Sequence, residues 1–162
     1  MGRNFDISDI GNDIIDSREV QGLYDDLISE QEDLEQAIKD ARADLKLARE
    51  EYDPLEGDGS VDEALEALDD AEQELEGFNA DHASLMRDIE DAMEQVSDWQ
   101  YGETLIHERH WEEYVEELCN ELGYVNTKDV WWIEIDWRAT AKNVAMDYTT
   151  VDFIGHTYYA RS

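Results

Sequence analysis

The sequence predicts an α+β fold that is mostly α: a long antiparallel coiled-coil hairpin, then a small aromatic-cored α+β module ending in a β-hairpin. Three observations support this prediction. Apolar residues recur at heptad spacing over residues 17–98, proline occurs once in 162 residues, and most aromatic residues follow residue 100. We therefore divide the chain into an acidic N-terminal segment (1–16), a helical hairpin (17–98) and an α+β module (99–162).

The first predicted helix carries a seam of apolar residues at alternating steps of four and three, in which only Gln31 is polar. This a/d spacing packs knobs into holes between helices. Asp16 or Ser17 can cap the start of the helix, and Pro54 with the glycines after it ends the helix. The seam residues are Val20, Tyr24, Leu27, Leu34, Ile38, Ala41, Leu45, Ala48 and Tyr52.

A second apolar seam follows Ser60, which is a suitable helix N-cap. Its phase slips between Leu75 and Phe78, next to Gly77, which predicts a local bend or a change of partner. We interpret His82 as a partly buried packing residue or one that sets the register. Two seams joined by a short loop favour a hairpin with arms about 50 Å long. Because a lone hairpin buries one stripe, pairing between chains in a homodimer stays open. The seam residues are Val61, Leu65, Leu68, Leu75, Phe78, His82, Leu85, Ile89 and Val96.

The remaining residues predict a compact module. His107–Leu122 has the pattern of an amphipathic helix, and Trp131–Ile135 that of a short strand or extended segment. Asp136 can cap a helix from Trp137 to about Met146, and residues 148–160 predict a terminal β-hairpin. We expect the core of this module to contain Trp111, Trp131, Trp132, Trp137, Tyr148 and Phe153.

Charge excludes several classes of partner. The chain has 44 acidic and 12 basic residues, a formal net charge of −32, so nucleic acid and anionic membranes would repel it. No apolar run approaches the roughly 18 residues of a membrane span, and the first ten residues lack the pattern of a secretory signal. A single cysteine, Cys119, demands no oxidising compartment. We expect a cytoplasmic protein.

No pattern of catalytic chemistry is present. The sequence lacks a P-loop, a dinucleotide fingerprint, a nucleophile elbow and a CxxC pair. His107 and His110 lack the HExxH spacing, so we interpret them as surface or capping histidines rather than metal ligands. Cys119 has no adjacent base, and the acidic loop at 53–62 fails the EF-hand pattern. We predict no enzyme, no catalytic residues, no cofactor and no metal.

The two arms of the hairpin concentrate the negative charge. Val61–Asp98 holds 14 acidic residues and one basic residue (net −13), and Val20–Tyr52 holds 10 and four (net −6). Together they place −19 along about 50 Å, or one net charge per ~3 Å, whereas duplex DNA carries one per ~1.7 Å. Such a rod could occupy a cationic groove that normally holds nucleic acid. A solvated coiled-coil face, or adaptation to high salt, would also account for this charge.

Four short acidic and aromatic motifs lie near the end of the chain: WEEYVEEL at 111–118, IDWRATAKNV at 135–144, MDY at 146–148 and VDFIGHTYYAR at 151–161. These motifs resemble those of ArdA-type antirestriction proteins and related phage anti-defence DNA mimics. The first motif is similar to an acidic EYAEEL-like helix of that group, and the others are similar to the pattern that closes its sequences. The likeness covers about residues 99–161.

This resemblance implies a protein of a phage or mobile element that blocks host defence by imitating DNA. Its target would be a restriction enzyme or, for an anti-CRISPR protein, a CRISPR effector. The chain departs from the group in two ways. Residues 17–98 replace the small acidic domains of the front part, and Arg138 and Ile154 stand where acids are usual. These departures leave the target open.

The leading hypothesis is thus an inhibitor that occupies the cationic surface of a basic, nucleic-acid-binding host complex without binding nucleic acid itself. The runner-up is a non-enzymatic coiled-coil structural or adaptor protein of a phage or halophile, whose acids keep the hairpin soluble. The predicted partner-binding residues of the leading hypothesis are Glu63, Glu66, Asp69, Asp70, Glu74, Asp88, Asp91, Glu112, Glu113, Glu116 and Glu117.

Overall fold

The chain divides into two compact units in the computed structural model. Tyr24–Met86 forms one, which we call the hairpin unit, and Met1–Leu23 together with Arg87–Ser162 forms the other, which we call the sheet unit. The three predicted segments follow the order of the chain, whereas the sheet unit draws on both sides of the hairpin. The residues that the structure describes are 7–52, 60–126, 128–129 and 131–161.

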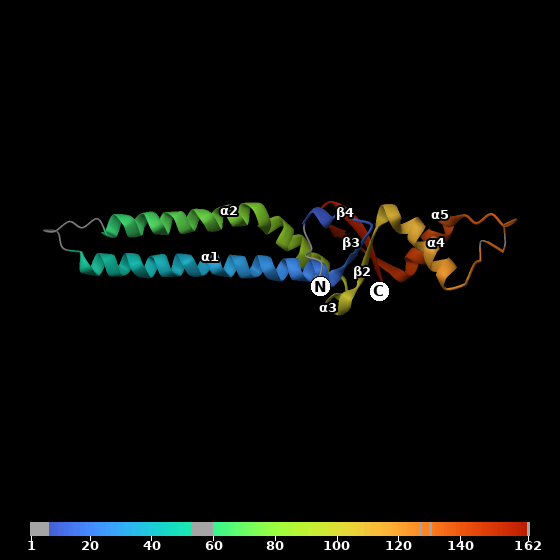
Figure 1. Cartoon of the computed structure of the whole chain (residues 1–162), viewed down its shortest axis with the longest axis horizontal. Coiled ribbons are helices and arrows are strands. Elements are labelled where there is room, and N and C mark those ends of the chain that lie inside the picture. Colours follow the sequence, from blue (N-terminus) through green and yellow to red (C-terminus); the bar gives the residue numbers. More distant parts are fainter. Residues whose placement is uncertain (1–6, 53–59, 127, 130, 162) are drawn as a thin grey trace. The chain divides into compact units, whose positions relative to one another are not determined.

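Two long helices form the hairpin unit and continue into the sheet unit. Helix α1 is Ser17–Glu51 and helix α2 is Ser60–Gln95, and within the hairpin unit they run antiparallel, side by side (Figure 1). The predicted fold class, α+β and mostly α with a helical hairpin, is confirmed. The predicted turn at 53–60 lies outside the described residues except for Ser60, the first residue of α2.

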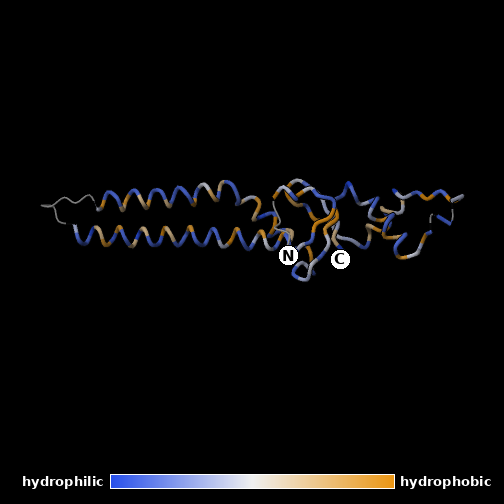
Figure 2. The backbone as a smooth tube through the Cα atoms, viewed as in Figure 1, coloured by the Kyte–Doolittle hydropathy of each residue, from blue (hydrophilic) through white to orange (hydrophobic). Residues whose placement is uncertain are grey.

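The heptad seam forms the contact between the two arms. Ile38 and Leu45 of α1 and Phe78 of α2 are buried, and apolar residues recur along both helices (Figure 2). The polar seam residue Gln31 donates a hydrogen bond from Nε2 to Asn79 Oδ1 of α2 at 3.0 Å. Because this bond joins two arms of one chain, the hairpin satisfies its polar seam residue without a second molecule.

The predicted phase slip in the second seam is wrong. Leu65, predicted in the seam, is 41% exposed, and Ala64 lines the cleft between the helices instead. Once alanines are included, positions at steps of three and four continue without interruption past Gly77, and α2 is one helix throughout. Alanine gives little apolar signal in a sequence, so the pattern of larger apolar residues alone predicts the wrong phase for the seam of α2. The continuous seam is Val61, Ala64, Leu68, Ala71, Leu75, Phe78, His82, Leu85, Ile89, Ala92 and Val96.

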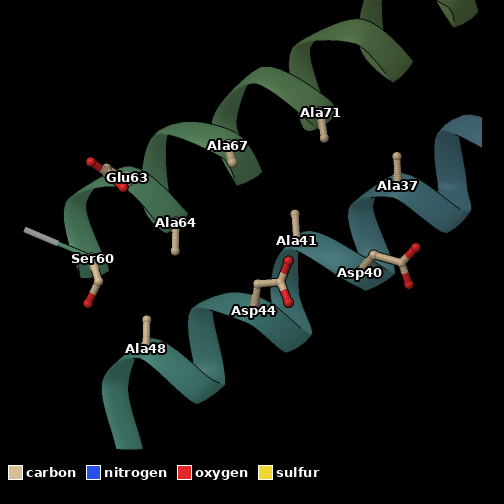
Figure 3. A pocket seen from close by; sticks show the side chains of 10 residues that line it. All are labelled: Ala37, Asp40, Ala41, Asp44, Ala48, Ser60, Glu63, Ala64, Ala67 and Ala71. Carbon is tan, nitrogen blue, oxygen red and sulfur yellow. The ribbon is translucent and has the colours of Figure 1, made fainter. Parts of the chain in front are cut away.

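Towards the end of α1 and the start of α2, alanines alternate with the larger apolar residues of the seam. Figure 3 shows Ala37, Ala41 and Ala48 of α1 across an open cleft from Ala64 and Ala71 of α2. The cleft has a volume of about 660 Å³. Short side chains bury little apolar area, so this end of the hairpin contributes less to stability than the leucine-rich part does.

The start of α1 is fixed by both residues that the sequence offered as caps. Asp16 Oδ1 accepts a hydrogen bond from the backbone N–H of Arg18 at 2.9 Å, which is the geometry of a capping side chain. Ser17 is fully buried, and its hydroxyl donates to the carbonyl oxygen of Trp99 at 2.7 Å and accepts from the N–H of Glu103 at 2.7 Å. Asp16 is therefore the cap, while Ser17 ties α1 to the short helix α3 (Trp99–Gly102).

Among the described residues, four strands form one antiparallel sheet in the order β1-β2-β4-β3. The predicted terminal hairpin is confirmed as β3 and β4, joined by Ile154 and Gly155, which both have positive φ, as tight hairpin turns require. The strands β1 and β2 were not predicted, and they pair Ile15 with Leu105. The bounds are β1 Ile14–Asp16, β2 Thr104–His107, β3 Tyr148–Phe153 and β4 His156–Arg161.

The predicted helix His107–Leu122 begins later than expected. Helix α4 is Trp111–Glu121, because Thr104–His107 is strand β2 and residues 108–110 form a 3₁₀ turn. Its amphipathic pattern was correct, since Trp111 and Val115 are buried. Helix α5 is Trp137–Val144, and the predicted cap is present: Asp136 Oδ1 accepts from the N–H of Ala139 at 2.9 Å. The remaining 3₁₀ turns are Ile7–Asp9 and Ala145–Asp147.

Part of the predicted aromatic core is confirmed. Trp111 is buried between α4, α5 and the sheet, and its ring stacks on Tyr159 with centroids 4.3 Å apart. Phe153 is also buried, Tyr148 is half-buried and packs against this core, and Trp137 is half-buried. The indole N–H of Trp111 donates to the carbonyl oxygen of Ala141 at 2.9 Å, so the buried polar atom is satisfied.

The predicted core positions Trp131 and Trp132 are wrong. Their side chains are 81% and 66% exposed, and they lie in the connection between α4 and α5 rather than in a strand. The four strands of the sheet, in the order β1-β2-β4-β3, do not include this segment. Alternation of apolar and polar residues here therefore has no partner strand to match among the described residues.

Candidate functional site

The predicted partner-binding residues of the hairpin unit all lie on the surface of α2. At about 100° per residue, most of them fall on one side of the helix, about 120° around from the apolar seam. Seam packing therefore leaves these carboxylates in solvent. The exposed residues are Glu63, Glu66, Asp69, Asp70 and Glu74.

A regular stripe of carboxylates runs along this side of α2. Glu63, Glu66, Asp70 and Glu74 fall within about 80° of one another around the helix. Asp81 is exposed and follows Glu63 by 18 residues, or about five full turns, so it lies at the same angle. Sequence reasoning missed Asp81, although the helical angle could have identified it. We call these five residues the α2 stripe.

The hairpin unit offers few cations to neutralise its carboxylates. Every described Asp and Glu between Tyr24 and Met86 is exposed. Arg42 pairs with Glu72 across the two helices at 2.8 Å, and Lys46 lies 3.8 Å from Glu50 within α1. No residue of the α2 stripe has an ion-pair partner within the described ranges. The negative charge of this surface therefore reaches the solvent.

A second acidic group lies on α4, opposite its buried side. Glu112, Glu113 and Glu117 are exposed, whereas Glu116 is half-buried. Glu113, Glu116 and Glu117 line a shallow hollow with Asn120, whose side chain donates to the carbonyl oxygen of Glu116 at 2.8 Å. Because Trp111 and Val115 fix the inner side of α4, these four carboxylates are held on a rigid element.

The last two predicted residues lie on the part of α2 that belongs to the sheet unit. Asp91 is exposed, and its carbonyl oxygen accepts from Gln95 Nε2 at 2.9 Å. Asp88 is half-buried. The eleven predicted residues thus fall on two helices and in both compact units, and we treat the α2 stripe and the α4 carboxylates as two separate acidic surfaces.

A buried polar cluster of the sheet unit was not predicted. His107 is 6% exposed at the end of β2, and its Nδ1 accepts from the N–H of Arg109 at 3.1 Å. A neutral imidazole whose Nδ1 accepts carries its proton on Nε2. That nitrogen lies 3.1 Å from His156 Nδ1, so His107 donates and His156 accepts. Burial, followed by the charge of Arg109, lowers the pKa of His107.

The same cluster ties down the segment before β1. Gly11 donates its N–H to the hydroxyl of the buried Tyr158 at 2.6 Å, and Arg109 donates to the Gly11 carbonyl oxygen at 2.7 Å. His110 contacts Asp13 through Nε2. These contacts give His107 the predicted capping role and place the half-buried His110 beside Asp13. The sequence signal for the contacts of Arg109 with Gly11 and of His110 with Asp13 was slight, because the partners lie about 100 residues apart.

Two further residues with reactive side chains, His82 and Cys119, have a packing role. His82 lies on the seam with its ring 4.8 Å from that of Phe78, and its buried Nδ1 has no hydrogen-bond partner, which fits the predicted packing role. Cys119 is half-buried and lines a cleft of about 530 Å³ beside Tyr148. Burial, together with a hydrogen bond to Tyr114, raises the pKa of Tyr148 to about 12.

Neither a metal-binding cluster nor a membrane-spanning helix occurs in the described part of the chain. Over the described ranges, no three His, Cys, Asp or Glu side chains converge closely enough to hold a metal ion. Nor does any helix among those residues combine the length and apolarity needed to cross a bilayer.

Comparison of the chain with models of protein families, with curated proteins and with solved structures gives no match. The resemblance to ArdA-type antirestriction proteins therefore rests only on the motifs after residue 99, and it stays a prediction.

Proposed function

We propose that the protein is an acidic DNA mimic, encoded by a phage or mobile element, that inhibits a nucleic-acid-binding defence complex in the cytoplasm of the host cell. The target would be a restriction enzyme or a CRISPR effector, and the inhibitor would occupy its cationic DNA-binding surface. The observation that carries this proposal is the α2 stripe, a row of exposed carboxylates without cationic partners among the described residues.

The spacing of the stripe supports the proposal. Glu63 and Asp81 are 18 residues apart, or about 27 Å along the helix, so the five carboxylates lie ~7 Å apart on average. One strand of duplex DNA carries one phosphate per ~3.4 Å. A row of Lys and Arg side chains that holds one strand would thus meet about one carboxylate for every two phosphates, and long flexible side chains can absorb part of the remaining difference.

The proposed inhibitor makes and breaks no covalent bond. Its carboxylates would contact the lysines and arginines that normally hold phosphates, and the field of the whole chain would steer the encounter. The α4 carboxylates would provide a second contact surface, and the resemblance of residues 111–118 to the acidic helix of antirestriction proteins supports their inclusion.

The runner-up, a coiled-coil adaptor, makes a different prediction about DNA. An adaptor would bind through its seam or an apolar surface, and a duplex would leave its binding unchanged. A mimic would be displaced by duplex DNA, because both occupy one cationic surface. The exposed Trp131 and Trp132 favour a protein partner of either kind, so competition with DNA decides between the two functions.

Displacement of a fluorescent duplex from purified restriction and CRISPR effector complexes tests the proposal. We expect the chain to displace the duplex, and its own affinity for the complex to be lower at 200 mM than at 50 mM salt. Reversing the charge of the exposed acids, in the variant Glu63→Lys, Glu66→Lys, Asp69→Lys and Asp70→Lys, should weaken displacement by at least about tenfold. Adding Glu113→Lys and Glu117→Lys should weaken it further.

The matched control exchanges an existing ion pair. The double variant Arg42→Glu and Glu72→Arg keeps the net charge and allows the contact between helices to re-form, so it should displace the duplex as the natural chain does. Undiminished displacement by the charge-reversed variants would exclude mimicry. Circular dichroism of each variant establishes that its helices are intact.

A further inference from the structure

The connection between α4 and α5 displays two tryptophans to solvent. Trp131 is 81% exposed and Trp132 is 66% exposed, and their rings meet edge to face with centroids 5.9 Å apart. The next residue, Ile133, is 53% exposed. Large aromatic side chains are usually withdrawn from water, and an exposed group of them marks a surface that binds something.

The charge of the chain limits what this surface can bind. Exposed carboxylates flank the tryptophans in the sequence, with Asp129 on one side and Glu134 on the other. A second copy of the chain would bring another −32 charge against the first, and nucleic acid or an anionic membrane would also be repelled. Charge complementarity therefore favours a cationic protein surface.

Within cationic surfaces, the aromatic pair favours arginine over lysine. A guanidinium group is planar and less strongly hydrated than an ammonium group, so it can stack on an indole face while its N–H groups bond to a carboxylate. Trp131 and Trp132 supply the faces, and Asp129 and Glu134 supply carboxylates, each two residues away in sequence from the nearer tryptophan.

We propose that Trp131 and Trp132, with Asp129 and Glu134, form an arginine-binding surface for a basic protein. This inference deepens the proposed function, on which it rests for the identity of the partner, because a DNA-binding surface presents arginines. The α2 stripe and the α4 carboxylates supply long-range attraction, and the tryptophan pair supplies short-range contacts of the kind that dominate binding energy at interfaces.

Two short peptides of equal charge test the proposal. Fluorescently labelled hexaarginine and hexalysine are titrated with the chain at low salt, and affinity is measured by anisotropy. We expect hexaarginine to bind about fivefold more tightly, the sum of two exposed cation–π contacts. Binding of hexaarginine, but not of hexalysine, should also protect tryptophan fluorescence from quenching by acrylamide.

Three variants assign the preference to the tryptophan pair. Trp131→Leu with Trp132→Leu keeps apolar side chains but removes the π faces, so the two peptides should bind equally. Tyr101→Ala removes an aromatic side chain that is 73% exposed elsewhere in the sheet unit, and it should retain the preference for arginine. Glu134→Gln should weaken both peptides, and hexaarginine more.

The inference is overturned if the natural chain binds both peptides equally, or if the leucine variant still prefers hexaarginine. Neither result touches the proposed function, because displacement of duplex DNA and its loss on reversal of the α2 acids are measured separately. Conversely, if the chain prefers hexaarginine but displaces duplex from none of the complexes, the arginine-binding surface is supported and the proposal of DNA mimicry is rejected.

Discussion

The hairpin unit and the sheet unit bury their apolar side chains in different ways. The hairpin unit buries one narrow seam, with contacts such as Ile38 and Phe78, and leaves every described Asp and Glu in solvent. The sheet unit buries a wider aromatic core and links distant segments by hydrogen bonds, such as that from Gly11 to Tyr158. A helix pair can therefore display many charges, because only about two residues in seven must be apolar.

Truncation of the sheet-unit core should have the largest effect. Trp111→Ala removes a buried ring together with its stacking on Tyr159 and its hydrogen bond to Ala141, and should lower the free energy of unfolding by about 3–5 kcal/mol. Trp131→Ala, at an exposed position, should change it by less than about 0.5 kcal/mol. Denaturant unfolding followed by near-UV circular dichroism measures both, and similar losses would contradict the described core.

A matched pair in α1 tests whether the hairpin depends on its seam. Leu45 is 7% exposed and Leu47 is 54% exposed, two residues away on the same helix. Leu45→Ala should lower the free energy of unfolding by about 2 kcal/mol, the lower end of the range for leucine, because the nearby alanine-lined cleft is already loosely packed. Leu47→Ala should be nearly neutral. Urea unfolding followed by helical circular dichroism distinguishes them.

The smallest expected effect is a pH dependence confined to the sheet unit. Because the pKa of folded His107 is lowered, the unfolded chain takes up this proton first as pH falls. The contribution of neutral His107 to stability is complete above about pH 6.5, the unfolded pKa, and is lost as pH falls below that value through the folded pKa. We expect the melting temperature to decline in this window.

The variant His107→Gln should flatten that decline, since it lacks the titrating ring. Tyr148 gives the opposite dependence of stability on pH, at high pH. Its pKa is raised to about 12, so its contribution is complete below about pH 10 and is lost as pH rises through 12. A His107→Gln melting temperature that still falls with the natural slope below pH 6.5 would assign the effect to another group.

The hairpin was predictable because its signal is local. Each step of three or four residues in the seam of α1 predicts a neighbour within the same helix, and the exposed acids follow from the same periodicity. The phase of the second seam was misread because Ala64, Ala71 and Ala92 complete it, and alanine gives little apolar signal. What the exposed acids bind depends on a partner, and the sequence contains no pattern that names one.

The sheet unit was harder to predict because its contacts are distant. β1 has three residues and pairs with β2 some 90 residues later, and β2 runs directly into the turn before α4. Neither has enough residues to show alternation. The prediction that Trp131 and Trp132 lie in the core follows from the rule that tryptophan is usually buried, whereas both side chains are exposed. The polar cluster around His107 was also not predicted, because several of its contacts join residues that are far apart in the sequence.

The connection between β1 and β2 allows the hairpin to change in length. β1 and β2 are adjacent antiparallel strands, and the whole of α1 and α2 is the connection between them. A connection that leaves and returns at neighbouring strands can be shortened or extended by whole heptads, seven residues from each helix at facing positions, while both its ends stay in place. The length of the charged surface is thus an adjustable quantity, free to be matched to the size of what it binds without redesigning the sheet.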